Sequence, residues 1–336
     1  METRLDIRRL DPHDDGQMQR FHEIGWRAEK EDDRPWSGFF TLTELTAFMR
    51  EQAADRRVVG YCAFDGDQMV GAGALLLPQL DNLEKAFGFI HVEPELRGRG
   101  TGGALVEVVA QAARDDGRRL LMVDADVNYA ERETAGVLRF AAAHGFSEVL
   151  DEVVRVLRLP VSQDRLDRLA GESAPRHEGY TLETYVDRLP RAYLRSYVHL
   201  RNQLMIDAPS GDVDFEASAV TAEILEEKLE LSVRMGRTTF ITVAVRDGEV
   251  VAHSDLSLPA GETYGWQLGT LVHRVHRGHR LGMATKVTNL RAVQRSHPDV
   301  VTVQTGNAET NQWMIAINVA LGFEPVGVAV ELKRHL

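Results

Sequence analysis

The chain has little cysteine, no long apolar run and a deficit of positive charge. Its 336 residues include one cysteine, Cys62, which excludes an internal disulfide framework and any metal site built from several cysteines. No apolar stretch approaches the roughly 18 residues of a membrane-spanning helix, and the charged N-terminus is unlike a signal peptide. The net charge of −12 argues against non-specific nucleic-acid binding, which needs lysine and arginine to neutralise phosphates. We therefore expect a cytoplasmic protein that binds neither membranes nor nucleic acid.

Length and composition fit a globular protein with two domains. Hydrophobic residues make up 43% of the chain and charged residues 27%, which does not suggest disorder. At roughly 150 residues per domain, this length predicts about two domains. We place the first at 1–160, a proline-containing charged linker at 161–178, and the second at 179–336.

An internal repeat supports this division. The segment 92–104 aligns without gaps to 272–284, with an offset of 277 − 97 = 180, and Gly145-Phe146 returns as Gly322-Phe323, with an offset of 177. Apolar periodicity predicts the same order in both halves: a strand, a long helical stretch, two strands around an Asp-Gly turn, then strand, helix, strand, helix and strand. Two copies of one α/β unit are the simplest interpretation.

A glycine-rich loop at 97–103 follows one of the predicted strands and opens the next predicted helix. Glycines let the backbone approach a ligand closely, and a helix N-terminus presents unpaired N–H groups, so a pyrophosphate is the natural guest. A tight turn that binds nothing is the plain alternative. Gly98-x-Gly100-x-x-Gly103, with Asp124 about 20 residues on, also fits the dinucleotide fingerprint. That fingerprint normally follows the first strand of its unit, and the repeat lacks it.

The loop resembles that of the GNAT superfamily of acetyltransferases. In that family Arg/Gln-x-x-Gly-x-Gly/Ala follows the fourth strand and holds the pyrophosphate of acetyl-CoA, and Arg97-x-x-Gly100-x-Gly102 fits the form. In the second half Arg277 and Gly282 fit, but Arg280 replaces a glycine. The resemblance covers nearly the whole chain. It implies an α/β (α+β) fold with two tandem GNAT-like domains, each a mixed, mostly antiparallel sheet flanked by helices.

The resemblance also implies which residues hold acetyl-CoA, the expected cofactor. They lie on the strand before each loop, in the loop and at the start of the following helix, with two asparagines later in the second half. They are Ile90, His91, Val92, Arg97, Gly98, Arg99, Gly100, Thr101, Gly102 and Gly103, and Leu271, Val272, Arg277, Gly278, His279, Arg280, Gly282, Met283, Asn307 and Asn311.

The second half is similar to double-domain GNAT proteins of the mycothiol synthase type found in actinobacteria. The similarity is carried by 207–212, 270–272, 276–279 and 307–311. It implies the tandem architecture, in which two halves mimic a dimer within one chain and a monomer is favoured. It does not by itself imply mycothiol synthesis.

Candidate catalytic residues lie on the strands near each loop. The family's usual acid, a tyrosine four residues before the Gly-Phe pair, is replaced by Ala141 and Asn318. Other groups must therefore move protons, and histidine and carboxylate side chains are suited to this. The candidates are His91, Asp124, Asp126 and Tyr129 in the first half, and His253 and Asp255 in the second.

These observations predict an acetyl-CoA-dependent N-acetyltransferase that moves an acetyl group directly to a primary amine of a small molecule. Asp207 and Asp212 are candidate substrate-binding residues, and the acidic candidates favour a cationic amine. The two missing tyrosines favour a different class, a non-catalytic acyl-CoA-binding or sensing pseudo-enzyme. A dinucleotide-dependent enzyme is the third interpretation. No metal site is predicted. His273, His276 and His279 lie on one expected strand-to-loop turn, with no cysteine nearby.

Overall fold

The chain divides into two units by its internal contacts. The computed structural model describes residues 5–30, 34–51, 53–207 and 211–336, and the side chains of 204–207 fall outside this description. Unit 1 comprises Met1–Glu152, Ser210–Asp214 and Gly327–Leu336, and unit 2 comprises Val153–Pro209 and Phe215–Val326. The expected division at 160 differs from these units, because the end of the chain belongs to unit 1 and 153–178 belong to unit 2.

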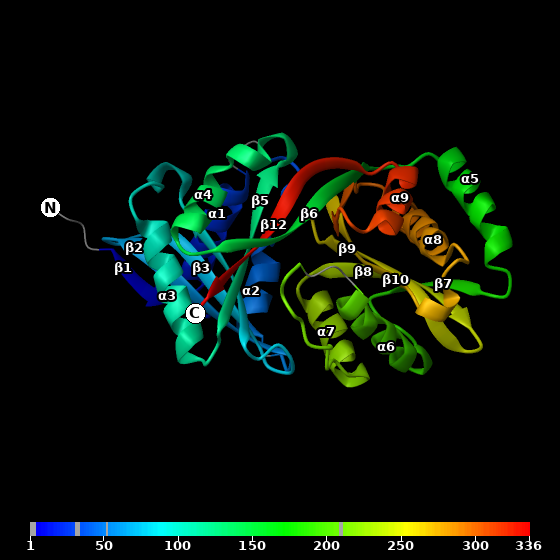
Figure 1. The fold of residues 1–336 in the computed structure, drawn as a ribbon, viewed down its shortest axis with the longest axis horizontal. Helices are drawn as coiled ribbons and strands as arrows, with labels where there is room; N and C mark the ends of the chain where they lie inside the picture. Colours follow the sequence, from blue (N-terminus) through cyan, green and yellow to red (C-terminus); the bar gives the residue numbers. More distant parts are fainter. Residues whose placement is uncertain (1–4, 31–33, 52, 208–210) are drawn as a thin grey trace. The chain divides into compact units, whose positions relative to one another are not determined.

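The first half of the chain contains the strands and helices predicted from its periodicity, most of which are labelled in Figure 1. The long helical stretch is two helices separated by the segment around Pro35. The elements are β1 (Asp6–Arg9), α1 (Asp15–Lys30), α2 (Leu42–Arg50), β2 (Arg56–Asp65), β3 (Gln68–Pro78), β4 (Lys85–Val92), η1 (Pro94–Leu96), α3 (Thr101–Asp115), β5 (Leu120–Asn128), η2 (Tyr129–Thr134), α4 (Gly136–Ala143) and β6 (Ser147–Arg158).

The second half repeats this order after an additional helix. That helix, α5, lies within the expected linker, and its Leu166 and Leu169 are buried in a core cluster with α8, so the segment is packed structure. The elements are α5 (Gln163–Ser173), η3 (Ala174–Arg176), β7 (Thr181–Val186), α6 (Arg191–Asp207), α7 (Ala222–Arg234), β8 (Arg237–Arg246), β9 (Glu249–Pro259), β10 (Tyr264–Val272), η4 (Arg274–His276), α8 (Leu281–Ser296), β11 (Thr302–Ala308), α9 (Gln312–Leu321) and β12 (Glu324–His335).

Local sequence accounts for several boundaries. Thr41 and Glu44 form a reciprocal capping box at the start of α2, which satisfies two N–H groups that the helix cannot. The β8–β9 hairpin turns at Asp247-Gly248, where both residues have positive φ (53° and 81°), as the tight turn matching the right-handed twist of the strands requires.

The two sheets exchange their last strands. The strand order is β1-β2-β3-β4-β5-β12 in unit 1 and β6-β11-β10-β9-β8-β7 in unit 2, which takes β6 from Val153 onward. β12 pairs antiparallel with β5 from Gly327 to His335. The final strand of the chain thus completes the sheet formed by the first half. Each sheet is mixed and mostly antiparallel, as expected, with one parallel pair, β4–β5 or β10–β11.

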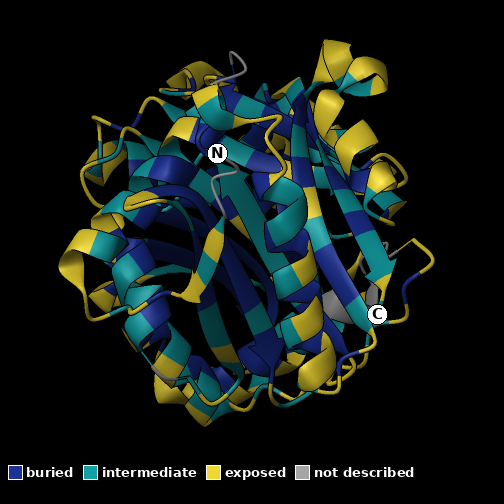
Figure 2. Ribbon diagram, turned by 90° about the vertical axis from the view of Figure 1, so that its left-hand side faces the viewer, coloured by how far each residue is buried: buried dark blue, intermediate teal, exposed yellow. Residues whose placement is uncertain are grey.

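Helices cover both faces of each sheet. In unit 1, α3 and α4 pack against one face, in a core that includes Val328 and Val330 of β12, and α1 and α2 pack against the other. In unit 2, α5, α8 and α9 cover one face, and α6 and α7 cover the other. Figure 2 shows the buried residues on the strands and the inner faces of the helices.

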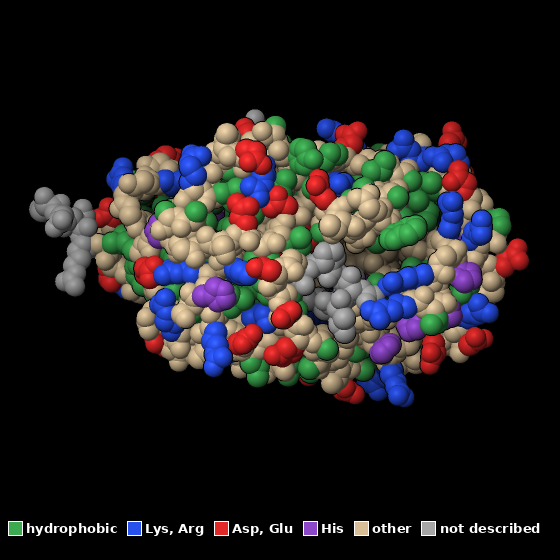
Figure 3. Space-filling model, in the orientation of Figure 1, with side chains coloured by type: hydrophobic (Ala, Val, Ile, Leu, Met, Phe, Trp, Pro, Cys, Tyr) green, Lys and Arg blue, Asp and Glu red, His purple; other side chains and the backbone are tan. Residues whose placement is uncertain are grey.

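Two surface properties bear on the expected partners. Among the residues described, none of the helices is both long enough and apolar enough to span a bilayer. On the face shown in Figure 3, acidic and basic side chains are interspersed over much of the surface.

Candidate active site

The glycine-rich loop of unit 1 ends in an uncapped helix N-terminus. η1 leads from β4 into the loop, and α3 begins at Thr101 after Gly100, which has a left-handed conformation (φ 89°). No side chain caps α3. In the described structure, the backbone N–H groups of 98–103 donate no hydrogen bond, whereas Ala104 donates to the carbonyl of Gly100. These donors and the helix dipole suit an anionic group such as a pyrophosphate.

A gap between β4 and β5 opens directly before this loop. The two strands are paired in parallel from Lys85–Leu120 to Gly88–Val123 and no further. Beyond Gly88, β4 stays paired with β3 up to Val92. The peptide groups of 89–92 that face β5 are therefore available to a ligand inserted between the strands. Ile90, His91 and Val92, the predicted cofactor contacts of this strand, lie along the gap.

Three of the predicted catalytic residues of unit 1, His91, Asp124 and Asp126, lie on the face of the sheet opposite α3, which α1 covers. Successive side chains of a strand point to opposite faces. Ala125 and Val127 pack in the core with α3, so Asp124 and Asp126 face the other way. His91 reaches Glu29 of α1. The loop and the candidate proton carriers therefore lie on opposite faces and meet at the gap.

His91 is held by a carboxylate from α1. Its Nε2 lies 2.9 Å from Glu29 Oε1, and the Ser37 hydroxyl donates to Glu29 Oε2 at 2.7 Å. Burial alone would raise the pKa of Glu29, but the hydrogen bond and charge of His91, with help from Arg34 and Ser37, lower it to about 2. Glu29 is therefore ionised at neutral pH and orients the imidazole.

Asp126 has the opposite character. Burial, and then the nearby charges of Glu29 and Asp124, raise its pKa to about 7, although Arg34 works against them. Arg34 donates one N–H to the backbone carbonyl of Asp126, at 2.7 Å. A carboxyl group that titrates near neutrality is suited to accept a proton.

Two more carboxylates lie beside Asp124. Glu331 of β12 is its direct cross-strand partner, and burial with the charges of Asp124 and Glu152 raises the pKa of Glu331 to about 7. Burial raises the pKa of Asp124 and of Glu152 as well. Within the described part of the chain, none of these three carboxylates has a lysine or arginine within ion-pair distance. They form a site of uncompensated negative charge.

The other candidate residues of unit 1, and Asp207, are not part of this group of side chains. Tyr129 is the first residue of η2 and is 48% exposed. Asp212 forms an ion pair with Lys333 of β12, so its carboxylate already has a cationic partner. Asp207 ends α6, and its side chain lies outside the described part of the structure.

Unit 2 repeats the loop and the gap with differences. α8 begins after Arg280, which takes the left-handed conformation (φ 53°) that Gly100 has in unit 1. β10 pairs with β11 from Tyr264 to Trp266, and its pairing with β9 has a register shift between Gln267 and Thr270. The β4–β3 register of unit 1 shows no such shift. Arg277, Gly278, His279 and Gly282 surround the start of α8, and Leu271 and Val272 lie ahead of it on β10.

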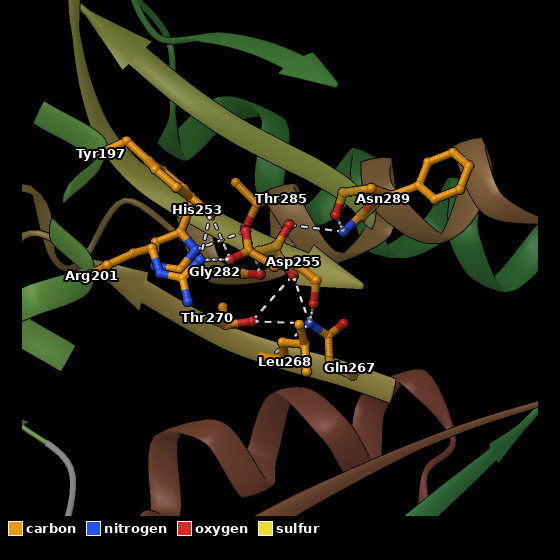
Figure 4. Close-up of polar contacts among 12 residues, drawn as sticks. Tyr197, Arg201, His253, Asp255, Gln267, Leu268, Thr270, Gly282, Thr285 and Asn289 are labelled. Atoms are coloured by element: carbon orange, nitrogen blue, oxygen red, sulfur yellow. Dashed lines mark hydrogen bonds and ion pairs between the residues drawn. The ribbon is translucent and has the colours of Figure 1, made fainter. Parts of the chain in front are cut away.

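His253 and Asp255 come together in a buried network of unit 2, shown in Figure 4. His253 Nδ1 lies 3.0 Å from Asp255 Oδ1, and the hydroxyl of Tyr197 on α6 donates to Asp255 Oδ2 at 2.7 Å. Burial would raise the pKa of Asp255, but His253, Arg201 and Tyr197 lower it. Arg201 lies 3.7 Å from this carboxylate. His253 is fully buried, and its Nε2 has no partner among the described residues.

The two asparagines of the second half differ in their use. Asn311 is the N-cap of α9, and its side-chain oxygen accepts the Met314 N–H at 3.2 Å. Asn307 lies near the end of β11, past the last residue paired with β10, and its oxygen accepts a hydrogen bond from Asn318. Met283 lies in the first turn of α8 and is buried in the core.

Sequence reasoning missed several members of these sites. Glu29, Arg34, Tyr197 and Glu331 are far along the chain from the strands they approach. No motif marks them, because α1, the segment that follows it, and β12 in unit 1, and α6 in unit 2, reach their respective sites only through tertiary packing. The alternation of β12 in sequence would have indicated that Glu331 faces away from the core, but not which strand it joins.

Comparison with known proteins agrees with this architecture. The family model described as Acetyltransferase (GNAT) family matches residues 19–146. None of the curated proteins matches the chain in sequence. Among solved structures, a tandem GNAT protein from the clavulanic acid biosynthesis pathway, determined without AcCoA, has 27% identity and a TM-score of 0.81, covering 99% of this chain and 98% of that one.

Two further structures share the fold at lower identity. A GCN5-related N-acetyltransferase from Sphaerobacter thermophilus is 15% identical with a TM-score of 0.66, covering 98% of this chain and 95% of that one. A glucosamine N-acetyltransferase region of a fungal multi-domain β-N-acetylglucosaminidase is 13% identical with a TM-score of 0.65, covering 99% of this chain and 38% of that one. Residues 19–146 therefore match the GNAT acetyltransferase family, and the chain as a whole shares the fold of a tandem GNAT protein.

Proposed function

We propose that unit 1 is an acetyl-CoA-dependent N-acetyltransferase that acts on a primary amine of a small cationic molecule. The observation that carries the proposal is the gap between β4 and β5, which ends at the uncapped N-terminus of α3 on one side and at His91 and Asp126 on the other. A thioester and an amine entering from opposite faces of the sheet would meet there.

The residues present fit acetyl-CoA. The free N–H groups of 98–103 supply donors for a pyrophosphate, and the unpaired edge of β4 at 89–92 supplies donors and acceptors for an extended amide-containing arm. No Cβ atom would meet a protein atom within 4 Å at Gly98 or Gly100, so the space over the loop is open. When bound, acetyl-CoA supplies a thioester whose carbonyl carbon an amine attacks, with the thiolate of CoA as the leaving group.

Asp126 is the proposed base. An amine attacks only with its nitrogen lone pair free, so the ammonium form must first lose a proton. With a pKa of about 7, Asp126 is deprotonated in part of the molecules at neutral pH and still basic enough to accept that proton. His91, oriented by Glu29, lies on the same face and holds the amine or relays its proton. The backbone N–H groups along the gap would stabilise the negative charge that develops on the thioester oxygen when acetyl-CoA is bound.

The proposed acceptor is cationic because of the charge around Asp124. Asp124, Glu152 and Glu331 lie together without a described cationic partner. Burial raises the pKa of each, and the charge of Asp124 adds to this effect at Glu152 and Glu331. A second ammonium group of the substrate would compensate this negative charge. A polyamine or an amino sugar has this chemistry, with one amine to bind and another to be acetylated.

The test compares two matched variants, Gly102→Val and Gly282→Val. Each adds a branched side chain at the second residue of the helix that follows a loop, next to one movable side chain, Phe140 or Ile317. We expect Gly102→Val to abolish both titration-calorimetric binding of acetyl-CoA to unit 1 and acetylation of spermidine, and Gly282→Val to retain the acetylation.

Circular dichroism establishes that both variants are folded. Acetylation that survives Gly102→Val and disappears in Gly282→Val would move the activity to unit 2. Tight binding of acetyl-CoA without transfer to any of a panel of amines would instead support a non-catalytic acyl-CoA sensor, which the absence of a tyrosine at Ala141 also favours.

A further inference from the structure

Unit 2 buries a lysine whose only described polar partner is neutral. Lys286 on α8 is 1% exposed, and its Nζ donates to Asn318 Oδ1 at 2.6 Å and lies 5.5 Å from the centre of the Phe323 ring. Burial lowers the pKa of Lys286 to about 7. Removing an ammonium group from water is costly, so a lysine at such a position calls for a reason beyond packing.

The fold itself does not require this lysine. The loop alignment places Val106 of α3 at the equivalent position in unit 1, and the helix alignment places Ala141 opposite Asn318. Val106 is 2% exposed and Ala141 5%, and both belong to the apolar core. The same site is thus filled by an apolar pair in one unit and a polar pair in the other.

A further hydrogen bond links Lys286 and Asn318 to Asn307, at the edge of the gap between β10 and β11. Asn318, which is fully buried, donates from Nδ2 to Asn307 Oδ1 at 2.6 Å. Because Lys286 donates a hydrogen bond, the oxygen of the Asn318 amide must face it. The NH₂ group of Asn318 then points the other way and donates to Asn307. Asn307 consequently receives a hydrogen bond at its oxygen, and its own NH₂ group remains for another acceptor.

Asn307 stands where a ligand in the gap would pass. It shares a strand face with Val303, which packs in the core with α8 and α9, and it lies beyond Gln304, the residue at which pairing of β11 with β10 ends. In unit 1 the corresponding face is that of α3 and its phosphate-binding loop. An amide N–H group can donate a hydrogen bond to a carbonyl oxygen of the pantetheine arm or of the thioester.

We infer that unit 2 also holds acyl-CoA and that Lys286 is a positioning residue of this second site, acting through Asn318 to aim the Asn307 amide N–H at a carbonyl of the ligand. The inference rests on the proposed function in one respect, that loops of this form bind acetyl-CoA. It assigns a role to three residues that neither loop contains.

The experiment isolates unit 2 in the Gly102→Val background and measures two ligands by titration calorimetry. Acetyl-CoA contacts both the loop and the gap, whereas adenosine 3′,5′-bisphosphate carries no pantetheine arm. Lys286→Met keeps the length of the side chain without its donor. We expect it to weaken acetyl-CoA binding three- to tenfold, the value of about one hydrogen bond, and to leave the binding of adenosine 3′,5′-bisphosphate unchanged.

A second variant avoids the core altogether. Asn307→Asp retains an oxygen for Asn318 but removes the outward N–H group, so it should weaken acetyl-CoA binding at least as much, again without affecting adenosine 3′,5′-bisphosphate. Asn289→Ala is the matched control, because Asn289 is also a buried polar residue of α8, but it donates to the Ser254 carbonyl of β9. It should lower thermal stability without changing the ratio of the two affinities.

Three results would overturn the inference. Wild-type affinity in Lys286→Met, or an equal loss for both ligands, would leave the lysine with a structural role only. A Gly102→Val protein that binds no acetyl-CoA at all would show that unit 2 takes none. In that last case the wild type would still bind one equivalent in unit 1, so the proposed function would stand.

Discussion

At the scale of single residues, the carboxylates of unit 1 show how the partner decides the effect of burial. Glu29 and Asp126 are close enough to influence each other, and both are largely removed from water. Glu29 accepts hydrogen bonds from His91 and Ser37 and stays ionised, whereas burial dominates at Asp126 and raises its pKa. Sequence reasoning selected Asp126 and His91 from their strands, but the pairing that separates their roles comes from α1.

The pH dependence of catalysis follows from Asp126. Its basic form is the deprotonated one, so kcat/KM with an excess of acetyl-CoA should rise with pH through about 7 and then level off. From pH 6 to pH 8 the expected increase is roughly tenfold for a single group of this pKa. Asp126→Asn should reduce the rate by about 10²- to 10⁴-fold and remove this rise. A rise that persists unchanged in the variant would assign the titration to another group.

The raised pKa of Glu331 leads to a separate prediction about the stability of the fold. Its folded-state pKa of about 7 lies above the usual 4.5, so the folded protein holds this proton more tightly than the unfolded chain. The associated stability is complete below pH 4.5 and is lost as the pH rises through 7. Glu331→Gln should therefore raise the free energy of unfolding by about 1–2 kcal/mol at pH 8 and leave it unchanged at pH 4.

Urea denaturation at the two pH values measures this difference. Glu133→Gln, at an exposed position of the same unit, is the control and should change stability at neither pH. A gain of equal size at pH 4 and pH 8 would mean that charge is not the cause.

At the scale of elements, the starts of α3 and α8 are two versions of one structure. Both helices follow a short 3₁₀ turn and a residue with a left-handed backbone, and no side chain caps either. The motif alone predicted these helices and loops closely, because glycine placement and helical periodicity are local properties. It did not reveal the register shift in β10, where Gln267 donates to the Asp255 carbonyl of the neighbouring strand.

Exchanging the residues before the two helices tests the backbone strain. A left-handed conformation costs a residue with a Cβ atom roughly 1–2 kcal/mol, partly offset by the greater freedom of glycine in the unfolded chain. Arg280→Gly should therefore raise the free energy of unfolding by about 0.5–1 kcal/mol, and Gly100→Arg should lower it by at least as much. Chemical denaturation of both variants should show shifts of opposite sign, and shifts of the same sign would exclude strain as the cause.

At the scale of the whole molecule, the two halves of the sequence do not coincide with the two units of the fold, because each unit contains the last strand of the other half. Val328, Val330 and Leu332 of β12 are buried in the core of unit 1, and β12 pairs with β5 along nearly all of its length. A division of the chain at 160 removes them. Repeat analysis assigns each half its own final strand, since an alignment records the order of elements and not the strand that each one joins.

A truncated chain tests this arrangement. The fragment 1–160 lacks the β12 residues of its core and leaves β5 unpaired on one side, so it should aggregate or show no cooperative thermal transition. A fusion of 1–152 to 324–336 through a long glycine-serine linker restores the missing strand and should melt cooperatively by circular dichroism. Cooperative melting of the unfused fragment would show that β12 is dispensable for unit 1.

The sequence by itself determined the two-fold repeat, the order of nearly all strands and helices, and the pair of glycine-containing loops before α3 and α8. These are encoded by periodicity, turn residues and short motifs, which act within a few residues of one another. Tertiary structure alone decided that β12 completes unit 1, that Glu29 orients His91, and that Lys286 reaches Asn307 through Asn318. Each of these joins segments tens to hundreds of residues apart, and such contacts form only because burying the apolar faces of both sheets brings those segments together.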